Sequence, residues 1–139
     1  MEVLTIEEPS TEESKPIEDG IMEYGLLQVN GIAPKKWAFH AIEAGEIVGG
    51  ATGRVHFSQF YLDNIWVKEE YRSKGIGTKI HEAVVTCAKQ CACHRIQLST
   101  LNEKAVRFYT RLNYETLAMI EGYVDGFNLY FMARKINRM

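Results

Sequence analysis

Apolar and polar residues alternate in several short segments of this chain, while other segments repeat their apolar residues every three to four positions. Alternation is typical of β-strands with one buried face, and the longer period is typical of amphipathic helices. The alternating segments predict strands at residues 2–6, 37–42, 46–55, 60–67, 95–100, 114–120 and 127–134. The other periodic segments predict helices at residues 14–28, 78–91 and 103–112.

Turn residues separate these elements. The Ala44-Gly45 and Asp125-Gly126 pairs are expected to close two hairpins, and Ser14 is expected to cap the first helix. Gly49, Gly50 and Gly53 interrupt the strand at 46–55, which indicates a bulge or a close backbone approach. The order of elements is β-α-β-β-β-α-β-α-β-β. Such an order is typical of an α+β fold, in which helices pack on a mixed, mostly antiparallel sheet.

The composition of the chain is typical of a globular protein. The chain has 139 residues, of which 46% are apolar and 24% charged, so we expect one globular domain over residues 1–139. No uncharged apolar run approaches the length of a membrane span, and the acidic start is unlike a signal peptide. Three cysteines, an odd number, argue against a disulfide scaffold. A cytoplasmic protein without a membrane partner is therefore expected.

The charge is unevenly distributed. Residues 1–23 contain eight acids and one base, whereas the remaining residues contain ten acids and fifteen bases, a net charge of +5. A mildly basic body suits an anionic cofactor but falls short of the balance typical of nucleic-acid binding. The acidic stretch is interpreted as a solvated surface, with a face for a cationic substrate as the alternative.

A short glycine-containing segment, Arg72-Ser73-Lys74-Gly75-Ile76-Gly77-Thr78, joins the strand at 60–67 to the helix at 78–91. The first amides of a helix lack internal partners and carry partial positive charge, so they can hold an anion. Glycine lets the backbone approach a ligand closely. The segment lacks the Gly-Lys-Ser/Thr of a P-loop and the third glycine of a dinucleotide fingerprint. The alternative is a capping turn without a ligand.

The same segment resembles the Arg/Gln-x-x-Gly-x-Gly/Ala loop of the GCN5-related N-acetyltransferases. A second motif of that family follows at the expected distance, as Asn102, Ala105, Phe108-Tyr109 and Asn113-Tyr114. Asn113 stands where the family has glycine. Asparagine is the next-best residue in the left-handed conformation, so the turn is expected to be kept.

This resemblance implies a centrally splayed sheet, acetyl-CoA as co-substrate, and transfer of its acetyl group to a primary amine of a small molecule or a peptide. Main-chain groups around Ile65, Trp66 and Val67 would pair with pantetheine. Arg72 and its neighbours in the glycine-containing segment would bind the pyrophosphate. The alternative for the Arg72 side chain is a surface ion pair. The resemblance assigns the following residues to the cofactor as well: Ser73, Lys74, Gly75, Ile76, Gly77, Thr78, Asn102, Ala105 and Phe108.

Two residues are candidates for proton transfer. Tyr109 falls on the family's tyrosine position and would protonate the leaving thiolate, unless it only packs the helix on the sheet. Asp63 would accept the amine's proton, and strand alternation predicts that it shares a face with Ile65 and Val67. A surface carboxylate is the alternative for Asp63. His56 and Glu43 are weaker candidates, and a water chain could replace all three.

Other functions are weighed on the same residues. Cys87, Cys91, Cys93 and His94 do not match a familiar zinc spacing, so no metal is expected. A non-catalytic acyl-CoA-binding module on the same fold is the main alternative to an enzyme. An RNA-acetylating toxin would need a stronger basic face. The acceptor is left open between a small-molecule and a peptide amine, and a homodimer is left open as well.

Overall fold

The computed structural model describes residues 1–28 and 33–136, which fall into two compact units divided between Ala33 and Pro34. The first unit contains one helix, α1 (Thr11–Gln28). Ser10 caps it through a reciprocal pair of hydrogen bonds: Glu13 N donates to Ser10 Oγ at 3.1 Å, and Ser10 N donates to Glu13 Oε1 at 2.9 Å. The cap is therefore Ser10, and the expectation of Ser14 was wrong.

The strand predicted at residues 2–6 is absent, because residues 1–10 form no regular structure. Val3, Leu4 and Ile6 are exposed there. Alternation over five residues makes a strand only where a neighbouring strand supplies hydrogen-bond partners. Over the described residues, the order of elements therefore begins with α1 and contains six strands.

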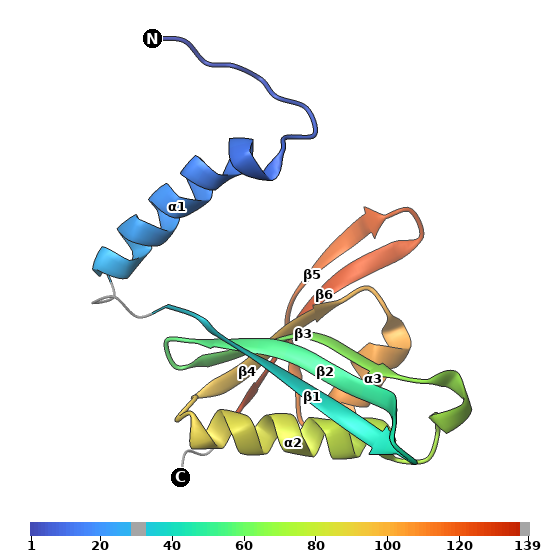
Figure 1. Ribbon diagram of the computed structural model, residues 1–139. Coiled ribbons are helices and arrows are strands. Elements are labelled where there is room, and N and C mark those ends of the chain that lie inside the picture. Colours follow the sequence, from blue (N-terminus) through green and yellow to red (C-terminus); the bar gives the residue numbers. More distant parts are fainter. Residues whose placement is uncertain (29–32, 137–139) are drawn as a thin grey trace. The chain divides into compact units, whose positions relative to one another are not determined.

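The second unit is a six-stranded mixed sheet with two helices (Figure 1), which confirms the α+β class. The strands lie in the order β1-β2-β3-β4-β6-β5. Their bounds are β1 (Lys35–Glu43), β2 (Glu46–His56), β3 (Gln59–Val67), β4 (Arg95–Thr100), β5 (Glu115–Val124) and β6 (Phe127–Lys135). A short 3₁₀ turn (Glu69–Tyr71) precedes α2 (Ile76–Gln90), and α3 (Glu103–Arg111) follows β4.

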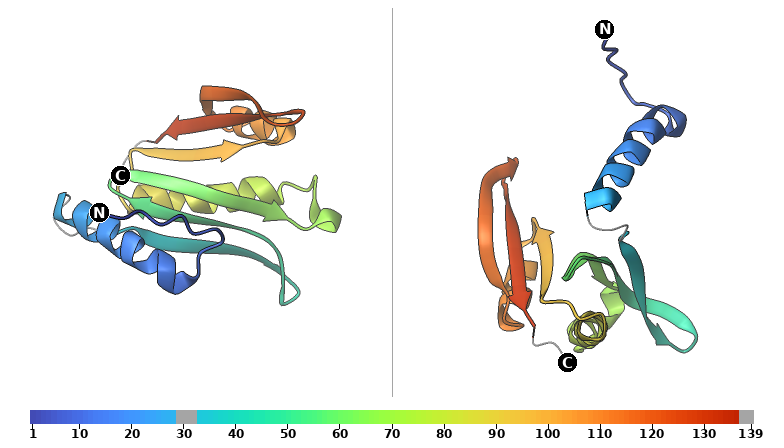
Figure 2. Two further views of the ribbon diagram at one scale, coloured as in Figure 1. Left: turned by 90° about the horizontal axis from the view of Figure 1, so that it is seen from above. Right: turned by 90° about the vertical axis from the view of Figure 1, so that its left-hand side faces the viewer.

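The sheet divides in its centre. β3 and β4 are its parallel pair, and they are in register only from Gln59–Tyr61 to Arg95–Gln97. Figure 2 shows β4 lying between β6 and β3. Because the pairing stops after three residues, one edge of β3 lacks a strand partner from Leu62 onward among the described residues. The expected central splay is therefore confirmed.

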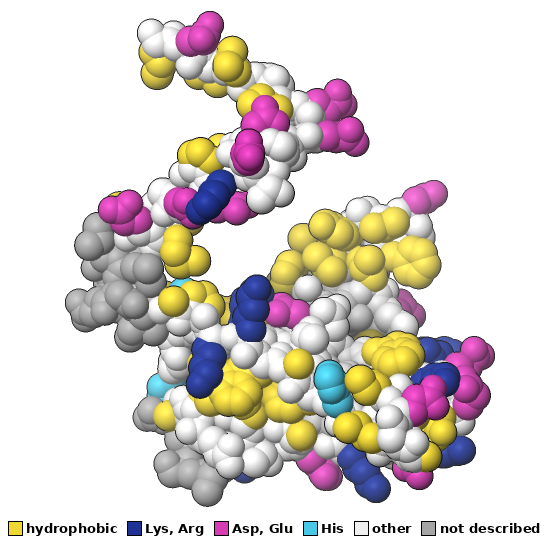
Figure 3. Space-filling model, in the orientation of Figure 1, with side chains coloured by type: hydrophobic (Ala, Val, Ile, Leu, Met, Phe, Trp, Pro, Cys, Tyr) yellow, Lys and Arg dark blue, Asp and Glu magenta, His cyan; other side chains and the backbone are white. Residues whose placement is uncertain are grey.

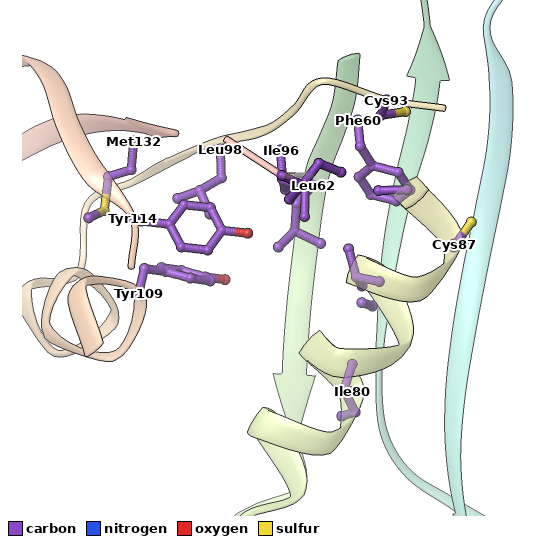
Figure 4. Packing of buried hydrophobic residues seen from close by; sticks show 14 residues of the cluster. Phe60, Leu62, Ile80, Cys87, Cys93, Ile96, Leu98, Tyr109, Tyr114 and Met132 are labelled. Atoms are coloured by element: carbon purple, nitrogen blue, oxygen red, sulfur yellow. The ribbon is translucent and has the colours of Figure 1, made fainter. Parts of the chain in front are cut away.

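The core lies between α2 and the sheet, around the almost fully buried Phe60, Val84, Ile96 and Met132 (Figure 4). The apolar residues of α2 that repeat every three to four positions include Ile80, Val84 and Cys87, and these three are buried. His81, a polar residue of the same helix, is only 1% exposed.

A bulge in β3 changes which residues share a face. The register with β2 runs from Thr52 opposite Asn64 to Gly53 opposite Leu62, so Asp63 is an extra residue. A Cβ on Gly53 would lie 2.6 Å from the backbone oxygen of Tyr61 on β3, so the strands approach closely there, as the glycines indicated.

The bulge contradicts one expectation from strand alternation. Ile65 and Val67 pack against the core, whereas Asp63 lies outside it with an exposed side chain. The prediction that the three share a face was wrong, because simple alternation assumes an uninterrupted ladder.

The hairpin of β5 and β6 presents apolar side chains to its surroundings (Figure 3). All ten residues of β5 are exposed, with Leu117 and Tyr123 at 58% each. Among the described residues, no helix is both long and apolar enough to cross a membrane.

Candidate active site

The glycine-containing segment forms an open start for α2. Ser73 (φ 61°) and Gly75 (φ 79°) are both left-handed, and Gly75 is the N-cap, without any side-chain capping bond. The first backbone hydrogen bond of α2 runs from Lys79 N to Gly75 O at 3.1 Å. The six N–H groups of residues 73–78 therefore donate to no other described residue. Consecutive free amides at a helix start make a concave anion site.

Two basic side chains of this segment are held by other contacts. Arg72 Nε donates to Val67 O at 2.8 Å, which ties the segment to the end of β3. Lys74 Nζ lies 5.6 Å above the Tyr71 ring centroid. Neither forms an ion pair with a described acid. The Arg72 side chain thus shapes the segment, and the ion pair considered as an alternative does not form with described residues.

The start of α2 meets α3 and the end of β3. A Cβ on Gly77 would lie 3.5 Å from Phe108 Cζ and 3.9 Å from Val67 Cγ2, so Gly77, Phe108 and Val67 are neighbours. Trp66, which precedes Val67 on β3, is 51% exposed. The structure therefore brings residues from both sequence motifs to one place, beside the unpaired edge of β3.

Both ends of α3 are capped by asparagine as predicted. Asn102 Oδ1 accepts from Lys104 N at 2.8 Å and from Ala105 N at 3.4 Å. At the other end Asn113 is left-handed (φ 69°) and Tyr114 N donates to Tyr109 O at 3.0 Å. This reversal is a Schellman motif, and it places Tyr114 directly against Tyr109.

Tyr109 belongs to a buried aromatic cluster. It is 4% exposed, and its ring centroid lies 5.2 Å from those of Phe108 and Tyr114. The hydroxyls of Tyr109, on α3, and of Tyr114, directly before β5, point the same way, toward β3 and α2 (Figure 4). Burial raises the pKa of Tyr109 well above its ordinary value of 10.0. Its phenol therefore stays protonated, as a proton donor must.

His81 completes this cluster, and sequence reasoning missed it. Its Nε2 is 2.7 Å from Tyr114 Oη, and its ring centroid is 6.5 Å from that of Tyr109. Burial, with a smaller contribution from the positive charge of Arg134, lowers the pKa of His81 from 6.5 to about 4. The imidazole is thus neutral near pH 7 and links α2 to the residue that precedes β5.

Asp63 lies where β3 and β4 separate, and it forms an ion pair with Arg54. Its Oδ1 accepts a hydrogen bond from Arg54 Nη1 at 3.0 Å, and the Arg54 guanidinium lies 4.8 Å above the Tyr61 ring centroid. All three line a hollow of about 240 Å³ between β3 and β4. His56, a weaker candidate for the base, stacks on Phe57 with its Nε2 buried and unpartnered by described residues.

A larger hollow of about 760 Å³ lies between the start of α3 and the tip of the β5–β6 hairpin. Asn102 lines this hollow, but no residue of the glycine-containing segment does. Within the described ranges, no three His, Cys, Asp or Glu side chains gather as a metal site, and the three cysteines are free thiols.

Comparison with known proteins places the chain in a family. Residues 1–114 match the model of the acetyltransferase (GNAT) family. The chain therefore belongs to this family, whose members transfer acetyl groups to amines, as the two sequence motifs indicated.

Three known proteins show the extent of the likeness. The blasticidin-S acetyltransferase of Streptomyces morookaense is 28% identical over 68% of this chain and 70% of its own length. The thialysine N-ε-acetyltransferase of Sus scrofa is 40% identical over 52% of this chain, but the match spans only 41% of that enzyme. The crystal structure of an acetyltransferase from Bacillus cereus superposes with a TM-score of 0.82, at 22% identity, over 96% of this chain and 98% of its own.

Proposed function

We propose that this chain binds acetyl-CoA with its pyrophosphate on the amides of residues 73–78, and transfers the acetyl group to a primary amine of a small molecule or a peptide. The observation that carries the proposal is the row of six unpaired N–H groups at the start of α2. A diphosphate is the ligand that such a row of donors suits best. The relatives named for blasticidin S and thialysine support a small-molecule acceptor.

The rest of the co-substrate fits the unpaired edge of β3. Pantetheine carries two amides, which can pair with the main chain between Leu62 and Val67 as a strand would. Phe108 and Gly77 flank this path, with Ala105 one turn before Phe108 on α3. Asn102 then acts by capping α3, because its side-chain oxygen is engaged by backbone amides.

The chemistry requires two proton transfers. The nitrogen of the neutral acceptor amine attacks the thioester carbonyl, and as the C–N bond forms it loses a proton to Asp63, the candidate base. The carbonyl oxygen gains negative charge, which main-chain N–H groups at the splay would stabilise. When the C–S bond breaks, the sulfur leaves with the electron pair and takes a proton from Tyr109 Oη. The products are the acetylated amine and the free thiol of coenzyme A.

A charge placed at the N-cap tests the proposed pyrophosphate site. Gly75→Asp puts a carboxylate where a Cβ meets open space, and aspartate tolerates the left-handed conformation. Repulsion of the diphosphate is expected to weaken binding of coenzyme A by about tenfold, and less at high salt. Isothermal titration calorimetry would measure the dissociation constant.

Gly75→Asn is the matched control, since it adds the same volume without the charge. Both variants should bind pantetheine, which lacks the diphosphate, equally well. Equal dissociation constants of the two variants for coenzyme A would place the pyrophosphate elsewhere.

The burial of Tyr109 favours a second candidate function, an acyl-CoA-binding module without catalysis. In that case Tyr109 only packs against Phe108 and Tyr114. A thiol-release assay with acetyl-CoA and a broad amine panel separates the two functions. A module would bind coenzyme A and release no thiol with any amine.

The three unpaired thiols support a reducing, cytoplasmic setting as part of the proposal.

A further inference from the structure

The ion pair of Arg54 and Asp63, where β3 and β4 separate, leaves several of its hydrogen-bonding groups without a partner among the described residues. Arg54 Nη1 and Asp63 Oδ1 make a single hydrogen bond of 3.0 Å, and the two side chains are 42% and 40% exposed. Asp63 Oδ2 and the other guanidinium N–H groups of Arg54 have no partner among the described residues. An arginine–carboxylate pair with a purely structural role is strongest as a two-bond fork. The pair can therefore still bind a ligand, because Arg54 has free N–H groups for an anionic group and Asp63 has a free oxygen for a cationic one.

Both charges are held in place by their surroundings. The guanidinium of Arg54 stacks over the Tyr61 ring, which restricts its position. Asp63 is the extra residue of the β3 bulge, so the backbone directs it away from the core. A ligand would therefore meet a fixed cation and a fixed anion side by side.

These two residues are the charged members of the wall of the 240 Å³ hollow between β3 and β4. The other lining residues are Tyr61, Leu62, Gln97, Leu98, Ser99 and Phe131. The volume is below the range of about 300–1,000 Å³ that drug-sized ligands occupy, so the hollow suits a small molecule. The hollow has one positive and one negative side chain, so it has no net charge. A polycationic amine would instead need acidic side chains that are not paired with an arginine.

We propose that the acceptor is a small amine that also carries a carboxylate, an amino-acid-like compound, with its amine at Asp63 and its carboxylate on Arg54. The inference rests on the proposed acetyl transfer and adds its substrate class. Arg54 binds the carboxylate through the N–H groups that Asp63 leaves free. Asp63 then faces the amine, where it also serves as the proton acceptor proposed above.

Matched acceptors test this assignment. Glycine, leucine and lysine are each compared with their amides and with the decarboxylated amines methylamine, isoamylamine and cadaverine. Thiol release from acetyl-CoA gives kcat/KM for each compound. Within every set that supports transfer, the free acid is expected to exceed the amide and the plain amine by about tenfold or more, the effect of a charge-assisted hydrogen bond.

Variants identify the residue responsible. Arg54 also holds Asp63, so Arg54→Gln should lower kcat/KM for every acceptor, but by about tenfold more for the acid than for the plain amine, while Arg54→Lys should fall between. Arg111→Gln, at the exposed end of α3, is the control and should change neither. Equal use of acid, amide and plain amine by the unaltered protein would overturn the inference. So would an Arg54→Gln effect of the same size on all three.

Failure of acetyl transfer itself gives a different result. In that case no compound releases thiol, and calorimetry with the coenzyme A-loaded protein measures the dissociation constants of the acids directly. Binding of the acids, weakened by Arg54→Gln, keeps the inference and contradicts the transferase function. Absence of binding by any acid contradicts the inference.

Discussion

Replacing Tyr109 by phenylalanine is expected to lower kcat by about 10²- to 10³-fold, within the range of a lost general acid. The dissociation constant of coenzyme A should change by less than twofold, because the ring and its contacts with Phe108 and Tyr114 are kept. The reason is the leaving group: without the phenol, the thiolate departs unprotonated. Burial holds the pKa of Tyr109 above 10.0, so the phenol is available as a donor throughout the neutral range.

Single-turnover thiol release at saturating acetyl-CoA measures this effect, and calorimetry measures coenzyme A binding. Tyr130→Phe is the control, because among the described residues the Tyr130 hydroxyl makes a single, exposed hydrogen bond of 3.4 Å, to Glu103. It should keep the rate within about twofold. A Tyr109→Phe variant with more than half of the original rate would mean that Tyr109 only packs.

Much of this site could be predicted because its parts are local in sequence. The free amides of residues 73–78 follow from a strand, a left-handed Gly75 and a helix start. The capping of α3 by Asn102 and its reversal at Asn113 follow from the preferences of asparagine for those positions. Local rules also gave the bounds of most strands within two or three residues.

The rest depends on contacts between distant segments. The bulge at Asp63 results from how β2 and β3 pair, so alternation along β3 alone placed Asp63 on the wrong face. Arg54 becomes its partner only once that register is known. The strand expected at residues 2–6 failed for a related reason, since alternation does not reveal whether a neighbouring strand exists.

His81 was missed because helical periodicity treats histidine as a polar, exposed residue. Its partner, Tyr114, is 33 positions away in sequence. The pair forms the one side-chain hydrogen bond that lies wholly in the interior among the described residues. A buried imidazole and a buried phenol tolerate each other through that bond, and each would be costly alone.

The interior pair of His81 and Tyr114 is therefore expected to make a large contribution to stability. His81→Leu leaves Tyr114 Oη without its partner and should lower the free energy of unfolding by about 2–3 kcal/mol. Tyr114→Phe should cost about 1–2 kcal/mol. Because the double variant leaves no unpaired polar group, its loss should be smaller than the sum by about 1 kcal/mol or more. Urea unfolding at pH 7.5 gives the four free energies, and strict additivity would show that the two residues act independently.

The same pair makes stability depend on pH with a defined sign. The pKa of His81 is about 4 in the folded protein and 6.5 as an ordinary value, so between these limits the unfolded chain binds a proton that the folded protein does not. Stability is therefore greatest above pH 6.5 and falls toward pH 4, by about 3 kcal/mol from this residue. His81→Leu removes this loss, so its unfolding free energy should decline less steeply than that of the unaltered protein over the same range. Parallel curves from pH 7.5 to 4.5 would mean that His81 is protonated in the folded state, which its burial beside Tyr109, Tyr114 and Arg134 argues against.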